Sequence, residues 1–431
     1  MTTAGAAMLR EDLVFVGTCD ISGHVRGKGF PAQEIQARRN KGVGWTHSNL
    51  MMSAFGPIFD TPFGTGGDLM IVPDVATEVR VDFADGSAPE HFFLGDMRNT
   101  DGSPWECCPR DFLRRALAAL EAAAGLRLIA AFEQEFVYTG TEDRPAHAYS
   151  LDAWRRQGAF GETFVAAMRA AGVVPDSFLP EYGNRQYEVT VAPAAALAAA
   201  DHAVITREMA RAVAHRLGHR VIFSPKPNAE GVGNGVHIHM SLQDEAGTPV
   251  TYEAGAHLGL SKLAQQFFAG VLHYLPAIAA ITAPSPVSYL RLVPNRWAPT
   301  EVNIVQQDRG AALRVCPVFA GPGLADVARQ YNVEFRVTDA SASPYMALGA
   351  VVFAGADGIA RGMALPVADA MAPALPGSLE AALTAMAGND TVCGWLGPVF
   401  LEAYLRHKRS ELATLTDLEP EELCDRYAEV Y

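Results

Sequence analysis

The sequence predicts an α+β protein in which a small domain built on one sheet precedes a larger domain of strands and helices. Over roughly the first hundred residues, short strand-like runs are separated by Pro, Asp and Gly, and one helical segment lies among them. Beyond residue 105, longer helical periodicities alternate with strands in which every second side chain is apolar. The segment Pro104–Pro109 separates the two patterns, so we expect domains at 1–104 and 105–431.

In the first domain the expected strands are short and bounded by turn residues. Asp20–Gly23 supplies the turn of a hairpin, and a helix is expected from Pro31 to Asn40 because Pro is tolerated in a first turn. The glycine- and aromatic-rich stretch Trp45–Gly67 has little periodicity, and no element is expected there. The expected strands are Leu13–Cys19, His24–Phe30, Leu69–Val72, Glu78–Phe83 and His91–Met97.

The second domain carries several long amphipathic helices. In the first of them, Asp111–Ala124, apolar residues recur at helical spacing and Gly125 ends the pattern. The last stretch, Ser378–Tyr431, is also helical by its pattern. Between these segments further helices are expected at Asp152–Ala171, Ala195–Leu217 and Ser261–Ala280.

One strand, Asn234–Leu242, has an apolar face and a face of groups that can bind a ligand. His237, His239 and Ser241 alternate with apolar residues, and successive strand side chains point to opposite sides of a sheet. Two histidines on one face can bind a metal ion, but they can also be solvated or satisfied within a core. The strand alone does not distinguish these possibilities.

Three further segments share this alternation and carry mainly carboxylates. Two like charges on one strand face repel each other unless a cation or water lies between them. If the four strands line one concave sheet, their polar side chains surround a shared cavity, and carboxylates with an imidazole suit Mg²⁺ or Mn²⁺ better than Zn²⁺. The alternative is four unrelated amphipathic strands. The candidate metal ligands are Glu133, Glu135, Glu181, Glu188, His237 and Glu334.

Composition restricts the class of protein. The 431 residues, 49% hydrophobic and 19% charged, are enough for a large core and are not typical of a disordered chain. The net charge of −14 argues against nucleic acid and anionic membranes as partners. No signal segment is evident in Met1–Asp12, and none of the six cysteines has CxxC spacing, so a reducing cytoplasm is expected. Cys107 and Cys108 are interpreted as an incidental pair of small residues.

From about Trp105 onwards the chain resembles the glutamine synthetase family, because the family's motifs occur in the family's order. The opening Asp20-x-x-Gly-x-x-Arg26-Gly-Lys is similar to that of the branch acting on amines other than ammonia. The resemblance implies a β-grasp N-terminal domain and a catalytic domain with a curved antiparallel sheet flanked by helices. The motifs are Glu133-Gln-Glu135, Glu181-Tyr-Gly-Asn-Arg-Gln-Tyr-Glu188, Lys226-Pro227 followed by Asn234-Gly-x-His-x-His-x-Ser, Arg291-Leu-Val-Pro, Asp308-Arg309 followed by Leu313-Arg314-Val-x-Pro317, and Val333-Glu-Phe-Arg336.

The resemblance also implies the reaction and the role of each residue. ATP phosphorylates the γ-carboxylate of L-glutamate, an amine attacks the acyl phosphate, and metal ions with arginines neutralise the phosphates. A homo-oligomer, commonly a dodecamer with active sites between subunits, is implied as well. By resemblance, Glu135, Glu181 and Glu188 hold the metal ion near glutamate, and Glu133, His237 and Glu334 hold the one near the phosphates. His239 and Ser241 lie on the nucleotide side, Arg291 binds the α-carboxylate, Arg309, Arg314 and Arg336 face the phosphates, and Gly233 and Gly235 let the backbone approach glutamate.

Two departures from the family pattern concern the amine. Ammonia-using members carry an Asp-Gly-Ser-Ser segment, which is not found between Gly44 and Asp68, and a flap glutamate at the position of Trp297. An indole removes a partner for a small cation and adds apolar surface, which favours an organic amine such as a small alkylamine, ethanolamine or a polyamine. The alternatives are an ordinary glutamine synthetase and a non-catalytic family member. Gly231-Val232 and Asn332 also differ from the family pattern, in the glutamate and nucleotide regions.

Overall fold

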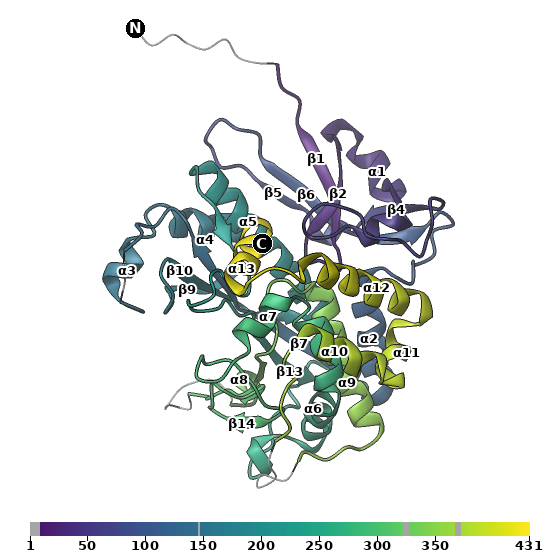
Figure 1. Cartoon of the computed structure of the whole chain (residues 1–431), viewed down its shortest axis with the longest axis vertical. Coiled ribbons are helices and arrows are strands. Elements are labelled where there is room, and N and C mark those ends of the chain that lie inside the picture. Colours follow the sequence, from purple (N-terminus) through teal and green to yellow (C-terminus); the bar gives the residue numbers. More distant parts are fainter. Residues whose placement is uncertain (1–8, 145–146, 320, 322–326, 367–371) are drawn as a thin grey trace.

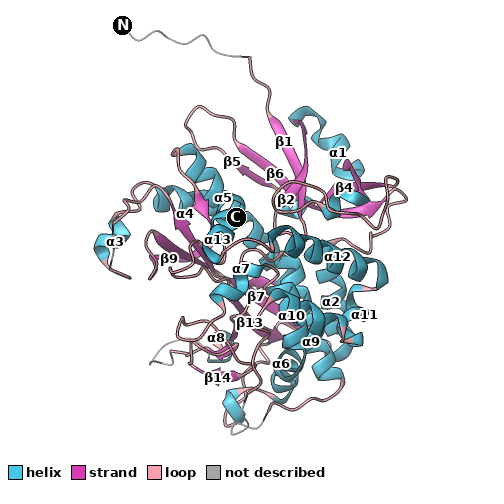
Figure 2. Ribbon diagram, viewed as in Figure 1, coloured by secondary structure: helices cyan, strands magenta, loops and turns pink. Residues whose placement is uncertain are grey.

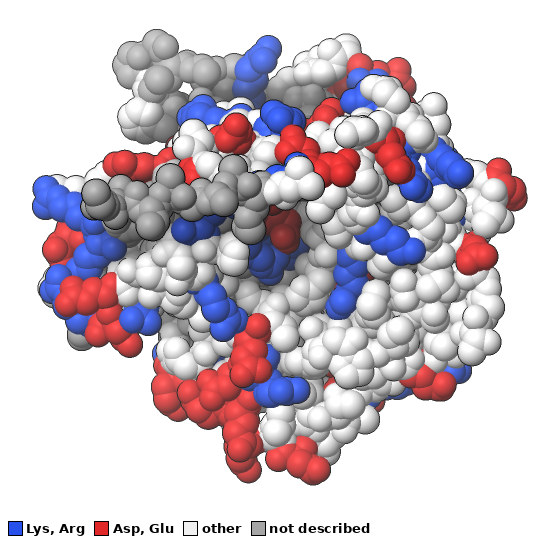
Figure 3. All heavy atoms as spheres, turned by 90° about the horizontal axis from the view of Figure 1, so that it is seen from above, with Lys and Arg blue, Asp and Glu red and all other residues white. Residues whose placement is uncertain are grey.

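The computed structural model describes residues 9–144, 147–319, 321, 327–366 and 372–431. The first eight residues lie outside the described part, and with them most of the Met1–Asp12 stretch in which no signal segment was expected. The N-terminal sheet lies at the top of Figure 1 and meets the C-terminal helices below it. On the face drawn in Figure 3, acidic and basic side chains are interspersed among uncharged ones.

The N-terminal sheet has the strand order β2-β1-β6-β4-β3, and β5 pairs with β6. The strand predicted at Leu13–Cys19 is confirmed, and β1 runs parallel to β6. The predicted helix begins as a 3₁₀ turn at Ala32–Glu34 and ends where Gly42 adopts a φ of 69°. Strand β3 was not predicted, because its four residues are too few to show an alternation. The elements are β1 Leu13–Cys19, β2 Val25–Pro31, α1 Ile35–Lys41, β3 Val43–Thr46, β4 Asp68–Pro73, β5 Val79–Val81 and β6 Glu90–Asn99.

Among the described residues after β6, two further sheets meet at Glu133. The strands β7 and β8 are consecutive in the sequence, but β8 belongs to the sheet β12-β8-β10-β9, and β7 to the sheet β11-β7-β13-β16-β15-β14. The four site strands, expected in one sheet, are therefore divided between two. The strands are β7 Arg127–Phe132, β8 Gln134–Tyr138, β9 Pro175–Pro180, β10 Gln186–Val191, β11 Ala194–Ala195, β12 Val221–Ile222, β13 Ile238–Gln243, β14 Ile304–Gln306, β15 Leu313–Val315 and β16 Val333–Phe335.

Helices cover these sheets and form a large apolar core beside them (Figure 2). The predicted helix Asp152–Ala171 is two helices, because Gly158 between them adopts a φ of 62°. Helix α9 was not predicted, and most of its side chains are buried. The helices are α2 Pro109–Ala124, α3 Leu151–Arg155, α4 Phe160–Ala170, α5 Ala196–Arg216, α6 Lys262–Thr282, α7 Pro286–Arg291, α8 Val327–Gln330, α9 Pro344–Ala360, α10 Leu379–Ala387, α11 Asp390–Leu396, α12 Pro398–Leu415 and α13 Pro420–Val430.

Helices α6 and α9 pack at very close range. A Cβ atom on Gly270 of α6 would lie 2.1 Å from the carbonyl oxygen of Ala354 on α9, so only glycine allows this approach. Helix α6 is long and apolar enough to span a membrane, but 78% of its most apolar window is buried inside the protein. Such burial is typical of a core helix. The α+β class predicted from the sequence is confirmed by this architecture.

Candidate active site

A cavity of about 1160 Å³ lies where the four-stranded sheet β12-β8-β10-β9 meets the sheet β11-β7-β13-β16-β15-β14. Its walls come from both sheets, from the loop before β13 and from the loop after α7. The structure brings every site residue predicted from the sequence to this one cavity. These residues are Glu133, Glu135, Glu181, Glu188, Gly233, Gly235, His237, His239, Ser241, Arg291, Trp297, Arg309, Arg314, Glu334 and Arg336.

Four carboxylates line the cavity from the four-stranded sheet, the three predicted ones and Asp176 on β9. Glu135 on β8 lies directly opposite Glu188 on β10, and Glu181 follows the end of β9. The backbone N–H of Gly235 donates to Glu135 Oε2 over 2.7 Å. Burial raises the pKa of Glu135 to about 7, and burial together with the surrounding carboxylates raises the pKa of Glu188 to about 10. Arg291 and Arg336 lower the pKa of Glu135 and Arg309 lowers that of Glu181, but burial outweighs them, so the negative charge of these carboxylates is only partly compensated.

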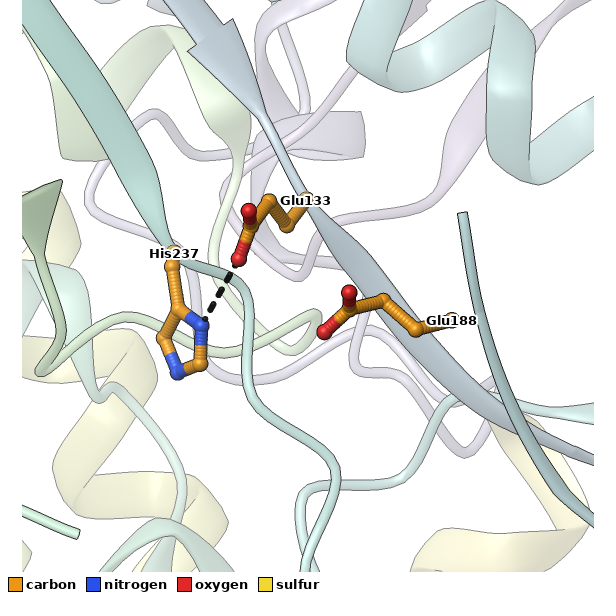
Figure 4. Close-up of side chains that lie close together, drawn as sticks. All are labelled: Glu133, Glu188 and His237. Carbon is orange, nitrogen blue, oxygen red and sulfur yellow. Dashed lines mark hydrogen bonds and ion pairs between the residues drawn. The ribbon is translucent and has the colours of Figure 1, made fainter. Parts of the chain in front are cut away.

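A second group of ligating atoms lies at the edge of the other sheet at the cavity, β11-β7-β13-β16-β15-β14. Glu133 Oε2 is 3.1 Å from His237 Nδ1, as Figure 4 shows, and its Oε1 is 2.9 Å from His239 Nε2. His237 Nδ1 also lies 3.2 Å from Glu334 Oε1. Burial on its own raises the pKa of Glu133, but the two imidazoles outweigh it and hold that pKa well below its ordinary value. The group thus joins both sheets through Glu133.

Two arginines of the cavity wall pair with the buried carboxylate of Glu334, and a third, Arg291, binds backbone carbonyls. Arg314 NH1 lies 2.8 Å from Glu334 Oε2, and Arg336 pairs with Glu334 Oε1. Arg291, at the end of α7, donates through NH2 to the carbonyls of Val337 and Thr338 over 2.5 and 3.0 Å. Its Nε is buried without a hydrogen-bond partner, so this guanidinium retains donors for a ligand.

Comparison with known proteins identifies the architecture. The protein-family model of the glutamine synthetase catalytic domain matches residues 106–426, and the family model of the glutamine synthetase N-terminal domain matches residues 5–105. The chain belongs to the glutamine synthetase family. It is therefore a ligase of this family, as the resemblance predicted, and the expected fold and enzyme class are confirmed.

Relatives within the family differ in the amine that their names imply. A gamma-glutamylpolyamine synthetase of Streptomyces coelicolor is 33% identical over 96% of this chain and 92% of its own length. A glutamine synthetase of Pyrococcus woesei is 32% identical over 80% of this chain and 74% of its own. The crystal structure of a novel glutamine synthase homolog superposes with a TM-score of 0.94, at 41% identity over 99% of this chain and 100% of that one. A structure titled apo GmaS has a TM-score of 0.81, at 25% identity over 95% of each chain.

Members of the family use ATP with a divalent metal ion, and the cavity fits such ions. Glu133, Glu188 and His237 offer ligand atoms within 4.8 Å of one another, and so do Glu133, His239 and Glu334. A divalent cation would stabilise the opposed carboxylates of Glu135 and Glu188, because like charges at paired strand positions repel. Carboxylates and imidazoles are the donors that Mg²⁺ and Mn²⁺ accept, whereas neither group contains a thiolate.

Sequence reasoning missed three aromatic residues of the cavity, Tyr149, Tyr182 and Tyr331, and one polar contact. Tyr149 and Tyr182 line the wall near Trp297, and the Tyr149 hydroxyl donates to both carboxylate oxygens of Glu181, over 2.9 and 3.0 Å. Asn332 Oδ1 lies 2.8 Å from His239 Nδ1. Tyr182 directly follows Glu181 in the sequence, and this adjacency could have indicated it. For Tyr149, in an irregular loop, no sequence pattern was available.

Proposed function

We propose that the protein joins the γ-carboxylate of L-glutamate to an organic amine, using ATP, and that it disfavours ammonium. The observation that carries this proposal is the place of Trp297 in the wall of the cavity. Its indole packs edge-on against Tyr182, with ring centroids 4.8 Å apart, and its carbonyl accepts from Arg336 NH2 over 3.3 Å. An aromatic wall beside the carboxylates gives an alkyl group a surface to contact, where a flap carboxylate would attract a small cation.

The residues of the cavity divide the proposed chemistry among them. Glu135, Glu181 and Glu188 hold one metal ion, and Glu133, His237 and Glu334 hold another. Mg²⁺ is the ion that we propose, with Mn²⁺ as a substitute. When bound, these ions supply positive charge that offsets the repulsion between triphosphate and carboxylate.

The arginines and glycines position the two substrates in this proposal. Arg291 binds the α-carboxylate of glutamate through the donors that the backbone carbonyls leave free. A Cβ atom at Gly233 would lie 2.6 Å from Arg291 Cγ, so this glycine leaves room for that side chain. Arg309, Arg314 and Arg336 neutralise the phosphate oxygens, and His239 with Ser241 lies beside the nucleotide.

The same residues account for the two steps of the reaction. The γ-carboxylate oxygen attacks the terminal phosphorus of ATP, and ADP leaves. The amine nitrogen then forms a bond to the carbon of that carboxyl group, the bond from this carbon to the phosphate oxygen breaks, and the nitrogen loses a proton. Arg336 and Glu334 lie closest to this chemistry in the proposal, because they form a buried pair at the cavity wall.

Two further expectations stay proposals. All six cysteines carry free thiols, which supports a reducing cytoplasm as the location. A homo-oligomer with active sites between subunits, a dodecamer by family resemblance, is proposed on the resemblance alone.

Ordinary glutamine synthetase activity is the second candidate function, since relatives named glutamine synthetase reach 32% identity. The ligand groups retained in the cavity argue against a non-catalytic role.

Phosphate release from Mg-ATP and L-glutamate, with a panel of amines, tests the proposal. The panel contains ammonium, methylamine, isopropylamine, ethanolamine, putrescine, spermine and aniline. We expect a clear response to an organic amine and a weak one to ammonium, and we expect Trp297→Glu to shift the preference towards ammonium. A response to ammonium alone would establish the ordinary glutamine synthetase instead. Silence with every amine would refute both.

A further inference from the structure

Three aromatic rings that lie far apart in the sequence meet in the wall of the cavity. Tyr149 and Tyr182 pack edge to face with centroids 5.3 Å apart, and Tyr182 and Trp297 do so at 4.8 Å. All three line the cavity, yet they remain 52%, 50% and 56% exposed, respectively. Large aromatic side chains gain free energy when such surface is covered, so these rings offer a contact surface to a ligand in the cavity.

Two of the three rings are carried by strained backbone. Tyr149 has a φ of 56° and Trp297 a φ of 55°, in the left-handed region that bulky residues rarely adopt. Such conformations persist where the surroundings enforce them, and they cluster at binding and catalytic sites. Here the Tyr149 hydroxyl is fixed on Glu181, and the Trp297 carbonyl on Arg336. These contacts hold the Tyr149 hydroxyl and the Trp297 backbone, and both rings pack against Tyr182.

The charges beside the rings favour an uncharged ligand group. The carboxylate of Glu181 accepts two contacts from the Tyr149 hydroxyl and, in the proposed function, binds a metal ion, so it has little capacity left for a second cation. An exposed arginine, Arg296, lines the same cavity next to Trp297, and no phosphate is assigned to it. A second ammonium group at this place would meet positive charge.

We infer that Tyr149, Tyr182 and Trp297 form the subsite for the organic substituent of the amine, and that this subsite takes a short uncharged alkyl or aryl group of a primary monoamine. The inference rests on the proposed function and specifies its substrate class. The amino group faces the carboxyl carbon of the γ-glutamyl phosphate, while the substituent covers the exposed ring surface. Ammonium leaves that surface uncovered, and a diamine places its second positive charge near Arg296.

The inference is tested by comparing kcat/KM for amines that differ in one feature, at saturating Mg-ATP and glutamate. Methylamine and propylamine differ by two methylene groups, and butylamine and putrescine differ by a second ammonium. Each fully buried methylene group improves binding about fourfold, and the rings cover the two extra methylene groups only in part. We therefore expect kcat/KM for propylamine to exceed that for methylamine about tenfold. Butylamine should exceed putrescine by about the same factor or more. A preference for putrescine would overturn the inference.

Substitutions locate the effect on the rings. Trp297→Ala and Tyr182→Ala should each bring the ratio of propylamine to methylamine close to one, whereas Trp297→Phe should retain most of it. Trp154 on α3 is a matched control, because it is 40% exposed and does not line the cavity. Trp154→Ala should leave the ratio as it is in the wild type. An unchanged ratio in Trp297→Ala and Tyr182→Ala would overturn the inference.

Hydroxylamine separates this inference from the proposed function. It carries no carbon substituent, and its attack on the acyl phosphate gives a γ-glutamyl hydroxamate that is measured directly. If the ring variants form the hydroxamate, they are folded and make the acyl phosphate. A propylamine-to-methylamine ratio that stays at the wild-type value in such a variant then contradicts the subsite but not the ligase activity. Absence of hydroxamate from the wild-type enzyme would refute the ligase itself.

Discussion

Arg291→Lys tests how the cavity recognises glutamate. The guanidinium is 5% exposed, and two backbone carbonyls occupy its NH2 group, which leaves Nε and NH1 for a carboxylate. Lysine keeps the charge but loses the two-pronged contact, that is, one charge-assisted hydrogen bond of about 1.5–3 kcal/mol. The KM for glutamate should therefore rise about 10- to 100-fold, with a much smaller change in kcat.

Arg207→Lys is the matched control for this measurement. Arg207 is equally buried, at 2% exposure, and it donates to the carbonyl of Ala340, in the same segment that Arg291 holds, but it does not line the cavity. Initial rates of hydroxamate formation over a range of glutamate concentrations give KM for both variants. If Arg291→Lys changed KM by less than twofold, or if Arg207→Lys raised it as much, the assignment of Arg291 to the α-carboxylate would be wrong.

Three other expectations follow from the contacts described above. Glu334→Ala and Glu135→Ala should each abolish turnover while circular dichroism stays that of the wild type, and near-normal activity in either would contradict its role as a metal ligand. Asn332→Leu should raise the KM for ATP about tenfold, because His239 loses the acceptor at 2.8 Å, whereas Asn332→Asp should not. Burial lowers the pKa of His407 from 6.5 to about 4, so below pH 6.5 the unfolded chain takes up a proton that the folded protein does not. Between pH 7 and pH 5 the wild type should therefore lose about 2 kcal/mol more free energy of unfolding than His407→Gln, measured by urea denaturation, and equal losses would contradict this assignment.

The sequence predicted the composition of the site better than its architecture. Carboxylates and imidazoles on alternating strand positions are a local pattern, and the cavity collects them all. The local pattern could not show that β7 and β8 belong to different sheets. The segment Leu128–Tyr138 looks like one continuous strand, and its division at Glu133 depends on which strands pair with each half. The division of the chain at residues 104 and 105 stays a prediction.

The elements that the sequence did not reveal have physical reasons for their absence. Helix α9 is apolar on every side, so it shows no helical stripe, and its burial between α2 and α6 explains why it needs none. The break at Gly158 falls inside an otherwise regular helical pattern. The aromatic subsite unites residues 149, 182 and 297, and only the fold brings such distant positions together.

The junction at Glu133 has a consequence for how this protein could acquire its substrate. Half of the groups assigned to the phosphates lie on strands, His239 and Ser241 on β13, Arg314 on β15 and Glu334 on β16, whereas all three aromatic rings lie on loops: Tyr149 before α3, Tyr182 between β9 and β10, and Trp297 between α7 and β14. Substitutions in those loops leave the hydrogen-bonded register of the phosphate strands untouched. Substitutions at three loop positions can therefore change the amine that is used as the nucleophile. The residues that phosphorylate the γ-carboxylate need not change.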